Sequence, residues 1–415
     1  MTFLTAVHSN RGGDVFVGEE YAAAAFDGAR ERHLAAEETI PLPQGATLMA
    51  LDSRRAQAFD SRGHLRTLAR ERWALAALLP TGYTRTLYPA YADDPSLPDL
   101  PLFGYAAVGM QGDELRVAAI STDPAPEWDP KAFNTVDLRS RVADALVRFP
   151  SNRMLRQLAR CAREYGCYTA QNVFYGRWEA ALPASPACNA RCVGCISLQE
   201  GETAAPQERF RFAPNAEEIS EVAAAHLERP GAYMVSFGQG CEGEPLLAAR
   251  TIADAITRIR ARTARGVIHL NTNASLPGKL RRLVDAGLQS IRVSTISAIP
   301  STYAAYYRPE GYGWAEVRAS LHLAAERGLL VNINLLVLPG LTDRPDEVGA
   351  FVALLRELPR GVVQLRNLNA DPKRALAVFE PARSLLGVSA MLERYRAEAP
   401  HFALRSFTRP LAVEV

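Results

Sequence analysis

The sequence predicts an α/β protein: a partial (β/α)6 TIM-like barrel with an N-terminal α+β accessory domain. From about residue 177 onward, six apolar runs alternate with six amphipathic stretches of helical periodicity. Glycine follows several of these stretches, which is typical of helix ends, at Gly266, Gly287, Gly328 and Gly361. Six strand–helix units in a row predict parallel strands with right-handed crossovers. Six units are too few for the usual barrel of about eight strands.

The elements of the barrel are expected in alternation. The predicted strands are Trp178–Ala184, Tyr233–Gly238, Val267–Asn271, Ser290–Ser294, Val331–Val337 and Val362–Leu368. The predicted helices are Ala216–Leu227, Leu246–Arg262, Gly278–Ala286, Trp314–Arg327, Pro345–Leu358 and Ala375–Arg396. We therefore expect an α+β accessory domain at 1–175, the partial barrel at 176–370, and a C-terminal helix and extension at 371–415.

The first 175 residues carry hairpin and helix signals but no recognisable chemistry. Two hairpins are expected, joining Thr47–Leu51 to Ala56–Phe59 and Leu102–Val108 to Leu115–Ile120. Helices are expected at Thr67–Leu79, Asp137–Arg148 and Asn152–Tyr165.

Composition describes an ordinary globular protein and excludes several classes. Among 415 residues, 48% are hydrophobic and 22% charged, and the net charge of +2 gives no indication of a nucleic-acid partner. No apolar run approaches the length of a membrane span, and the start lacks a signal-peptide pattern. All six cysteines fall between Cys161 and Cys241, which favours a metal centre in a reducing compartment over secreted disulfides. We therefore expect a soluble, cytoplasmic protein.

Polar residues recur at a spacing of two along the predicted strands. They are His269, Asn271 and Asn273, then Arg292 and Ser294, then Asn332 and Asn334, then Gln364 and Arg366. Side chains alternate across a strand, so each set points to one face. Buried against helices without partners, each polar group would cost about 1–3 kcal/mol, whereas in a shared cavity they bind a polar ligand. The alternative is that some of them lie at strand ends, where they cap helices or meet water.

Cys188, Cys192 and Cys195 form a C-x3-C-x2-C motif directly after the first predicted strand, at the barrel end where active sites gather. Thiolates suit iron–sulfur clusters, and three of them hold three irons of a 4Fe-4S cluster and leave the fourth open. A zinc site is the first alternative, but no histidine between His64 and His226 completes its usual four ligands. Chance clustering of buried thiols is the second.

The segment Glu242-Gly243-Glu244-Pro245 follows the second predicted strand, and we call it the glycine-rich segment because Gly238 and Gly240 precede it closely. Together with the cysteine motif it resembles the radical S-adenosylmethionine (SAM) superfamily, where a glycine-glycine-glutamate-proline segment holds the methionine amino group. Glu242 departs from that pattern by replacing the first glycine. Gly194 departs too, because the family usually has an aromatic or apolar residue before the third cysteine.

The resemblance covers about residues 177–369 and implies a 4Fe-4S cluster on the three cysteines and SAM as second cofactor. It implies cofactor contacts from Glu242, Gly243, Glu244, Pro245, Asn271, Arg292, Ser294 and Asn332. It also implies an electron donor such as flavodoxin or ferredoxin. In this family the reduced cluster cleaves SAM reductively, and the resulting 5′-deoxyadenosyl radical abstracts hydrogen from the substrate. The sequence names no substrate.

Cys241 adjoins the glycine-rich segment and is our candidate catalytic residue, as hydrogen-atom donor or covalent substrate link. With Cys161 and Cys167 it could instead ligate a second iron–sulfur cluster. The remaining hypothesis is that all three are buried packing residues, as free cysteines often are.

Three functions remain open at this point. The first is a radical SAM enzyme acting on an unidentified substrate. The second is an RNA- or peptide-modifying member whose first 175 residues recognise the macromolecule. The third is a non-enzymatic iron–sulfur redox sensor.

Overall fold

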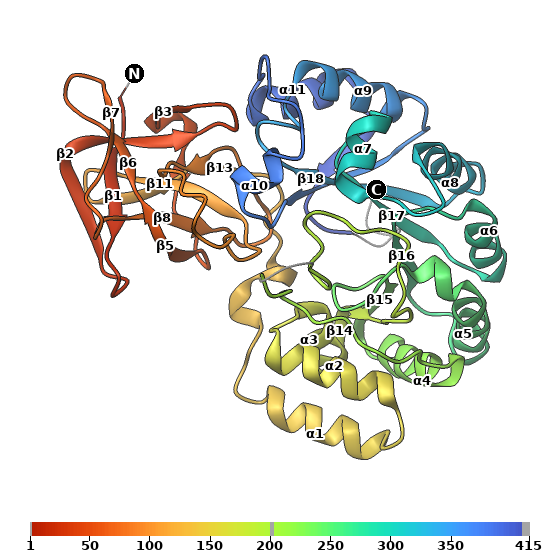
Figure 1. The fold of residues 1–415 in the computed structure, drawn as a ribbon. Helices are drawn as coiled ribbons and strands as arrows, with labels where there is room; N and C mark the ends of the chain where they lie inside the picture. Colours follow the sequence, from red (N-terminus) through yellow and green to blue (C-terminus); the bar gives the residue numbers. More distant parts are fainter. Residues whose placement is uncertain (1, 200–202, 409–415) are drawn as a thin grey trace.

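A computed structural model describes residues 2–199 and 203–408. It has two parts that lie side by side: an N-terminal part built of strands, and a curled parallel sheet with helices around its outer side (Figure 1). Within the described residues, no helix is both long enough and apolar enough to cross a membrane.

The curled sheet has seven strands in sequence order, and each neighbouring pair is parallel. The strands are β14 (Arg177–Ala181), β15 (Gly231–Phe237), β16 (Val267–Thr272), β17 (Ser290–Thr295), β18 (Leu330–Val337), β19 (Gly361–Asn367) and β20 (Phe402–Arg405). The predicted partial barrel is thus confirmed, and the structure adds β20 as a seventh strand. Sequence analysis missed β20 because only four residues form it.

The barrel helices are α4 (Ala216–Leu227), α5 (Ala249–Arg262), α6 (Pro277–Ala286), α7 (Pro300–Tyr307), α8 (Trp314–Glu326), α9 (Pro345–Arg356), α10 (Pro372–Leu376) and α11 (Val388–Glu398). A short 3-10 helix, η4 (Pro245–Ala248), precedes α5. The single helix expected over Ala375–Arg396 is wrong, because the chain forms α10 and α11 instead. Pro381 lies between them, and Gly387 at the start of α11 has a φ of 83°.

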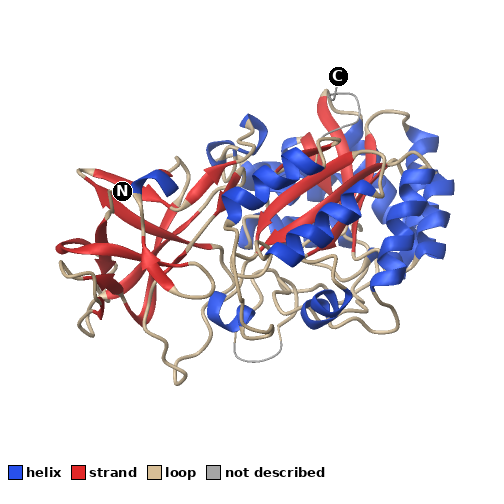
Figure 2. Ribbon diagram, turned by 90° about the horizontal axis from the view of Figure 1, so that it is seen from above, coloured by secondary structure: helices blue, strands red, loops and turns tan. Residues whose placement is uncertain are grey.

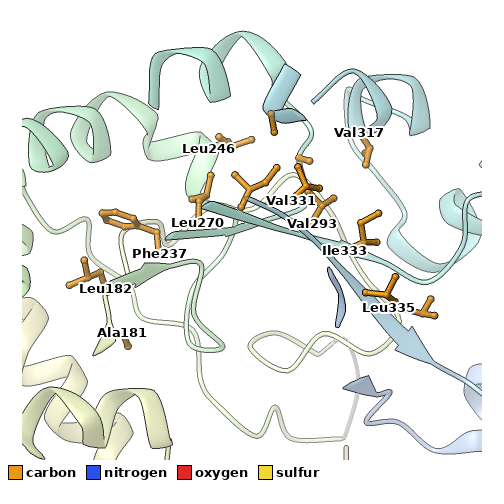
Figure 3. Close-up of a cluster of buried hydrophobic side chains, with 14 of the residues drawn as sticks. Ala181, Leu182, Phe237, Leu246, Leu270, Val293, Val317, Val331, Ile333 and Leu335 are labelled. Carbon is orange, nitrogen blue, oxygen red and sulfur yellow. The ribbon is translucent and has the colours of Figure 1, made fainter. Parts of the chain in front are cut away.

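The strand register separates apolar from polar faces. Leu270 pairs with Ile291, and Val293 with Ile333, so apolar rows run across the sheet on the side that packs against the helices (Figure 3). Asn271, Arg292 and Asn332 form the corresponding row on the other face. The apolar rows join one large buried cluster with the helices, so burial of this face holds the barrel together.

The N-terminal part is a largely antiparallel sheet assembly. Its strands are β1 (Thr5–Ser9), β2 (Val15–Phe26), β3 (Glu31–His33), β4 (Ile40–Pro41), β5 (Thr47–Arg55), β6 (Gln57–Phe59), β7 (Leu65–Thr67), β8 (Trp73–Leu78), β9 (Tyr83–Arg85), β10 (Tyr88–Pro89), β11 (Tyr105–Gln111), β12 (Glu114–Val117) and β13 (Ala119–Ser121). Short 3-10 helices are η1 (Ala36–Glu38), η2 (Pro126–Trp128) and η3 (Pro130–Ala132).

Two expectations for this part are wrong and one is confirmed. The helix expected over Thr67–Leu79 is instead strand β8, which pairs with β1, β5 and β11. Its Ala- and Leu-rich sequence favours a helix locally, but sheet pairing on both sides overrides that weak preference. β5 pairs with β8, not with β6, so the first expected hairpin does not form. The second, β11 with β12, does form around Gly112.

Three helices connect the two parts: α1 (Leu138–Arg148), α2 (Arg153–Glu164) and α3 (Tyr168–Tyr175). The first two match the predicted helices. Leu138, Leu158 and Phe174 belong to the same buried cluster as the barrel strands. These helices therefore pack with the barrel, whereas the sequence division at residue 175 places them in the accessory domain. That division remains a prediction.

The N-terminal part contacts the carboxyl ends of β18 and β19. The Arg85 guanidinium donates to the carbonyl oxygens of Val337 and Leu368, at 3.4 and 3.3 Å. At Gly28 the backbone passes so close that an added Cβ would lie 2.4 Å from the Cα of Gly340. Glycine at both positions therefore permits this close approach.

Candidate functional site

A cavity of about 380 Å³ opens at the carboxyl ends of the barrel strands. Figure 2 shows the strands with helices on one side and loops gathered on the other. The cavity is lined by these predicted site residues: Cys188, Cys192, Cys195, Glu242, Gly243, Glu244, Pro245, Asn271, Arg292 and Ser294. The structure thus brings together ten of the twelve residues expected from the sequence. Asn332 and Cys241 are not among the lining residues.

The cysteine loop is fixed from two sides by backbone hydrogen bonds. Arg191 and Val193 donate to the carbonyls of Tyr307 and Tyr306 at the end of α7, each at 3.0 Å. On the other side, Gly243 and Glu244 donate to Ser185 and Ala187, at 2.7 and 2.8 Å. The loop is therefore tied directly to the glycine-rich segment that follows β15.

The three thiols are half-buried and lie near one another. Burial raises the pKa of Cys192, and the neighbouring thiolates of Cys195 and Cys188 raise it further. Burial also raises the pKa of Cys188, with Glu244 and Cys195 acting in the same direction. Deprotonation of thiols in this setting needs a cationic partner, which a bound metal cluster would supply.

Gly194 explains the departure from the family pattern before the third cysteine. A Cβ at this position would lie 2.9 Å from both the Leu368 Cδ1 atom and the Tyr306 hydroxyl oxygen. Tyr306 comes from α7 and Leu368 follows β19, and both line the cavity. These two side chains occupy the space that an aromatic or apolar residue at position 194 would need.

Glu242 uses its carboxylate to shape the loop. One oxygen accepts from the backbone N–H groups of Gly238 and Gln239, and the other from those of Ala184 and Ser185, at 2.6–2.9 Å. These four donors fill the accepting positions of a carboxylate. Burial raises the pKa of Glu242 to about 7, while the four N–H groups act in the opposite direction. The carboxylate thus joins the ends of β14 and β15, a different task from the cofactor contact expected.

Glu244 keeps one accepting position that no described residue fills. Its carboxylate accepts from the backbone N–H of Leu246 at 2.9 Å, from that of Asn273 at 2.8 Å, and from the Thr272 hydroxyl. Burial raises the pKa of Glu244 to about 7. Pro245 stands at the first position of η4, where no backbone N–H is needed. The free position and the lining of the cavity suit a cationic amino group.

Asn271 and Asn273 are held by neighbouring groups. The Asn271 amide donates to the carbonyls of Phe237 and Gly238, and its oxygen accepts from His269. The Asn273 amide donates to the Asn189 side-chain oxygen at 2.9 Å, which links β16 to the cysteine loop beside Cys188. Both are therefore positioned before any ligand arrives.

The polar strand residues divide into two layers. His269, Asn332 and Gln364 are fully buried, and the Asn332 amide donates to Ser290 Oγ and to the Ile291 carbonyl. Burial lowers the pKa of His269 to about 3, so this layer is neutral. The cavity expectation holds for the upper layer only, which is Asn271, Asn273, Arg292, Ser294, Asn334 and Arg366.

Cys241 lies beneath the cavity wall, 3% exposed. Its thiol donates to the sulfur of Cys161, which lowers the pKa of Cys161 and raises that of Cys241. Cys167 is near both, and its backbone N–H donates to the Cys161 carbonyl at 3.1 Å. The three cysteines expected to act together are neighbours. Their role as a second cluster site remains a prediction.

Among the lining residues that sequence analysis did not select as site residues are Arg209, Asn334 and Arg366. Arg209 donates to Ser197 Oγ at 3.0 Å and to the Cys195 sulfur at 3.6 Å. Asn334 and Arg366 were recognised as polar strand residues but not selected as site residues. Ligands meet the carboxyl ends of parallel strands, so Asn334, two residues beyond Asn332, was the better choice.

The cysteine set fits an iron–sulfur cluster. Among residues 2–199 and 203–408, no three His, Cys, Asp or Glu side chains converge on one ion position. A 4Fe-4S cluster does not need such convergence, because each thiolate binds a different iron. Two buried polar atoms at the cavity, Asn334 Oδ1 and Arg292 Nε, have no partner among these residues. The cavity is thus suited to a polar ligand beside the thiols.

The structure combines a partial parallel barrel with three thiols and a glutamate-bearing loop at the strand ends. This is the arrangement that the sequence resemblance to the radical SAM superfamily leads us to expect. Residues 182–352 match the family model described as the radical SAM superfamily, so this part of the chain is a radical SAM domain. The resemblance read from the sequence is thereby confirmed.

Two curated relatives match part of the chain. Molybdenum cofactor biosynthesis protein 1 of Mus musculus is 30% identical over 197 residues, which is 45% of this chain and 28% of that protein. The mitochondrial GTP 3′,8-cyclase of Arabidopsis thaliana is 27% identical over 181 residues, 42% of each protein. The chain thus spans less than half the length of these relatives.

Solved structures show distant similarity. A radical SAM methyltransferase from Sphaerobacter thermophilus is 17% identical, with a TM-score of 0.39 over 55% of this chain and 65% of that one. The FeFe-hydrogenase maturase HydG from Carboxydothermus hydrogenoformans is 16% identical, with a TM-score of 0.41 over 66% and 67%. Scores this low carry nothing about function.

Proposed function

We propose that this chain is a radical SAM enzyme that abstracts hydrogen from an organic substrate bound in the barrel cavity. The observation that carries the proposal is the shared cavity: three thiols form one wall, and Glu244 lies directly beside them. Cys188, Cys192 and Cys195 would hold a 4Fe-4S cluster. Gly243, Glu244, Pro245 and Ser294 would hold SAM.

When bound, these groups supply reductive cleavage of SAM and hydrogen abstraction. The protein's own residues bind and position. Gly243 lets the backbone of the cysteine loop pass directly above it, since an added Cβ would lie 2.0 Å from the Ala187 oxygen. Glu244 offers its free accepting position to a cofactor ammonium group. Tyr306 and Leu368 close the space beside Gly194 and exclude water from it.

The test is anaerobic reconstitution of the full chain. We expect about four irons per chain and, with dithionite, release of 5′-deoxyadenosine. A triple variant with Cys188, Cys192 and Cys195 changed to alanine should lose both. Cys167→Ala, a half-buried thiol outside the cavity lining, is the matched control and should keep 5′-deoxyadenosine release. Release by the triple variant would disprove the proposal.

The finer function stays open within this proposal. One relative is named for cyclising GTP, but it matches only 42% of this chain. An RNA- or peptide-modifying role has no structural observation in its favour. The alternative of a redox sensor is disfavoured because a sensor needs no polar cavity beside its thiols; a cluster-loaded protein without affinity for SAM would revive it. As electron donor we propose flavodoxin or ferredoxin, which should replace dithionite in the assay.

A further inference from the structure

Two guanidinium groups line the cavity, and both are far from an ion pair with any carboxylate of residues 2–199 and 203–408. Arg292 comes from β17 and Arg366 from β19. Within the described ranges neither forms a salt bridge. Glu179 attracts both from a distance, and Asp123 attracts Arg366. Two cations facing one cavity repel each other, and this repulsion adds to burial in lowering the pKa of Arg366 to about 9.

Most of their hydrogen-bond donors have no partner in the part of the chain that the structure describes. A guanidinium carries five N–H donors and accepts nothing. The structure shows one such bond for Arg292, from Nη1 to the Gln364 side-chain oxygen at 3.3 Å, while its buried Nε has no partner among the described residues. Arg366 has no hydrogen-bond acceptor among the described residues. Its guanidinium group lies over the ring of Phe407, with 5.7 Å between the guanidinium carbon and the ring centroid.

Arg292 is directed away from the proposed cofactor segment. Its bond to Gln364 draws the guanidinium toward β19, across β18. Glu244 contacts Thr272 and Asn273 at the end of β16, the strand on the other side of β17 from β18 and β19. The resemblance assigned Arg292 to SAM, whereas this orientation groups it with Arg366.

We propose that Arg292 and Arg366 bind an anionic group, a phosphate or a carboxylate, of the substrate. The inference rests on the proposed function, because it places that substrate in the same cavity. The planar guanidinium fork matches the oxygens of either anion in bidentate fashion. An anion between the two arginines would satisfy their free N–H groups and remove their mutual repulsion. Asn334, on the strand between them, lines the same cavity and adds an uncharged polar side chain there.

The test measures binding of simple anions to the full-length protein with cluster and SAM bound and no reductant present. Radiolabelled pyrophosphate and citrate serve as the phosphate and carboxylate probes in equilibrium dialysis. We expect one of them to bind, and Arg366→Met and Arg292→Met each to weaken that binding by about tenfold or more, as loss of a charge-assisted bond does. Arg282→Met, on the exposed face of α6, should leave binding unchanged.

Each other outcome overturns the inference. Binding of neither anion to the wild-type protein does so, as does equal binding by the wild type and both cavity variants. Anion binding to cluster-loaded protein without SAM that is lost once SAM is bound would show that the arginines hold the cofactor's carboxylate instead. These outcomes are separate from failure of the proposed function, which would appear as wild-type protein without iron or without 5′-deoxyadenosine release.

Discussion

The Nη2 atom of Arg209 lies 3.6 Å from the sulfur of Cys195, to which it donates a hydrogen bond. Arg209 is thus a fixed positive charge beside one expected cluster ligand. Hydrogen bonds and charges at the ligand sulfurs tune the reduction potential of a cluster, and a cation favours the reduced state. Arg209 therefore bears directly on how readily the centre accepts an electron.

Replacing Arg209 tests this relationship. We expect Arg209→Met to lower the midpoint potential of the reconstituted cluster by about 50 mV, because loss of one charge-assisted bond destabilises the reduced state by about 1 kcal/mol. Redox titration followed by electron paramagnetic resonance measures the shift. Arg209→Lys keeps the charge and should shift the potential less. Equal potentials for the wild type and the methionine variant would show that Arg209 only positions the Ser197 side chain through its hydrogen bond.

Gly243 is expected to tolerate no side chain. A Cβ there would lie 2.0 Å from the Ala187 oxygen and 3.0 Å from the backbone nitrogen of Cys188. Gly243→Ala must therefore displace the loop that carries the first cysteine, and we expect loss of most bound iron after reconstitution. Gly278→Ala, in helix α6, is the matched control, since nothing lies within 4 Å of a Cβ added at Gly278. The control should stabilise the fold by about 0.5–1 kcal/mol and keep its iron.

Gly194 offers a test by compensation. Gly194→Phe restores the residue type that the family usually has, but Tyr306 and Leu368 occupy its space. We expect this variant to lower the thermal midpoint and the iron content. Combining it with Tyr306→Ala should recover part of both, because the removed phenol ring makes room. If the double variant is no better than Gly194→Phe alone, the contact with Tyr306 is not the cause.

The sequence was sufficient for the barrel because its signals are local and repeat along the chain. Each parallel strand is an apolar run that ends near a turn, and the cysteine spacing is compact. It was insufficient where pairing partners are distant. Trp73–Leu78 has a helix-forming composition, yet its neighbours β5 and β11 make it a strand. Likewise, only the three-dimensional arrangement shows that four backbone groups occupy Glu242 and that Arg292 is directed toward β19.

The interaction of Glu218 with Arg153 predicts how the stability of the connecting helices changes as the pH falls. It bonds Arg153 at the start of α2, and this bond is the main reason that the pKa of Glu218 falls to about 2. A lowered carboxyl pKa contributes stability above the unfolded pKa of about 4.5, and that contribution is lost as pH falls toward 2. We expect Glu218→Gln to lower the free energy of unfolding at pH 7 by about 1–2 kcal/mol, discounted because the Arg153 side chain is 46% exposed.

Urea denaturation at several pH values measures this effect. The difference between the wild type and Glu218→Gln should shrink as the pH falls from 5 to about 2.5, because the Glu218 carboxylate of the unfolded wild-type chain is then being protonated. Glu326→Gln, an exposed change on α8, should cost almost nothing at any pH. A difference that stays constant with pH would attribute the loss to the cap that Glu218 forms with Asn215 rather than to its charge.

The catalytic role expected of Cys241 stays a prediction. Because of the position of Cys241, we anticipate instead that its replacement leaves SAM cleavage intact. The side chain is 3% exposed, is absent from the cavity lining and already donates to Cys161. Cys241→Ala should therefore keep release of 5′-deoxyadenosine while destabilising the fold by about 1 kcal/mol through loss of buried contacts.

Iron analysis of the same variant addresses the second cluster. A fall from about eight irons to about four would establish a cluster on Cys161, Cys167 and Cys241. A constant value near four would leave these thiols as packing residues, and loss of cleavage with iron intact would restore Cys241 as a catalytic residue.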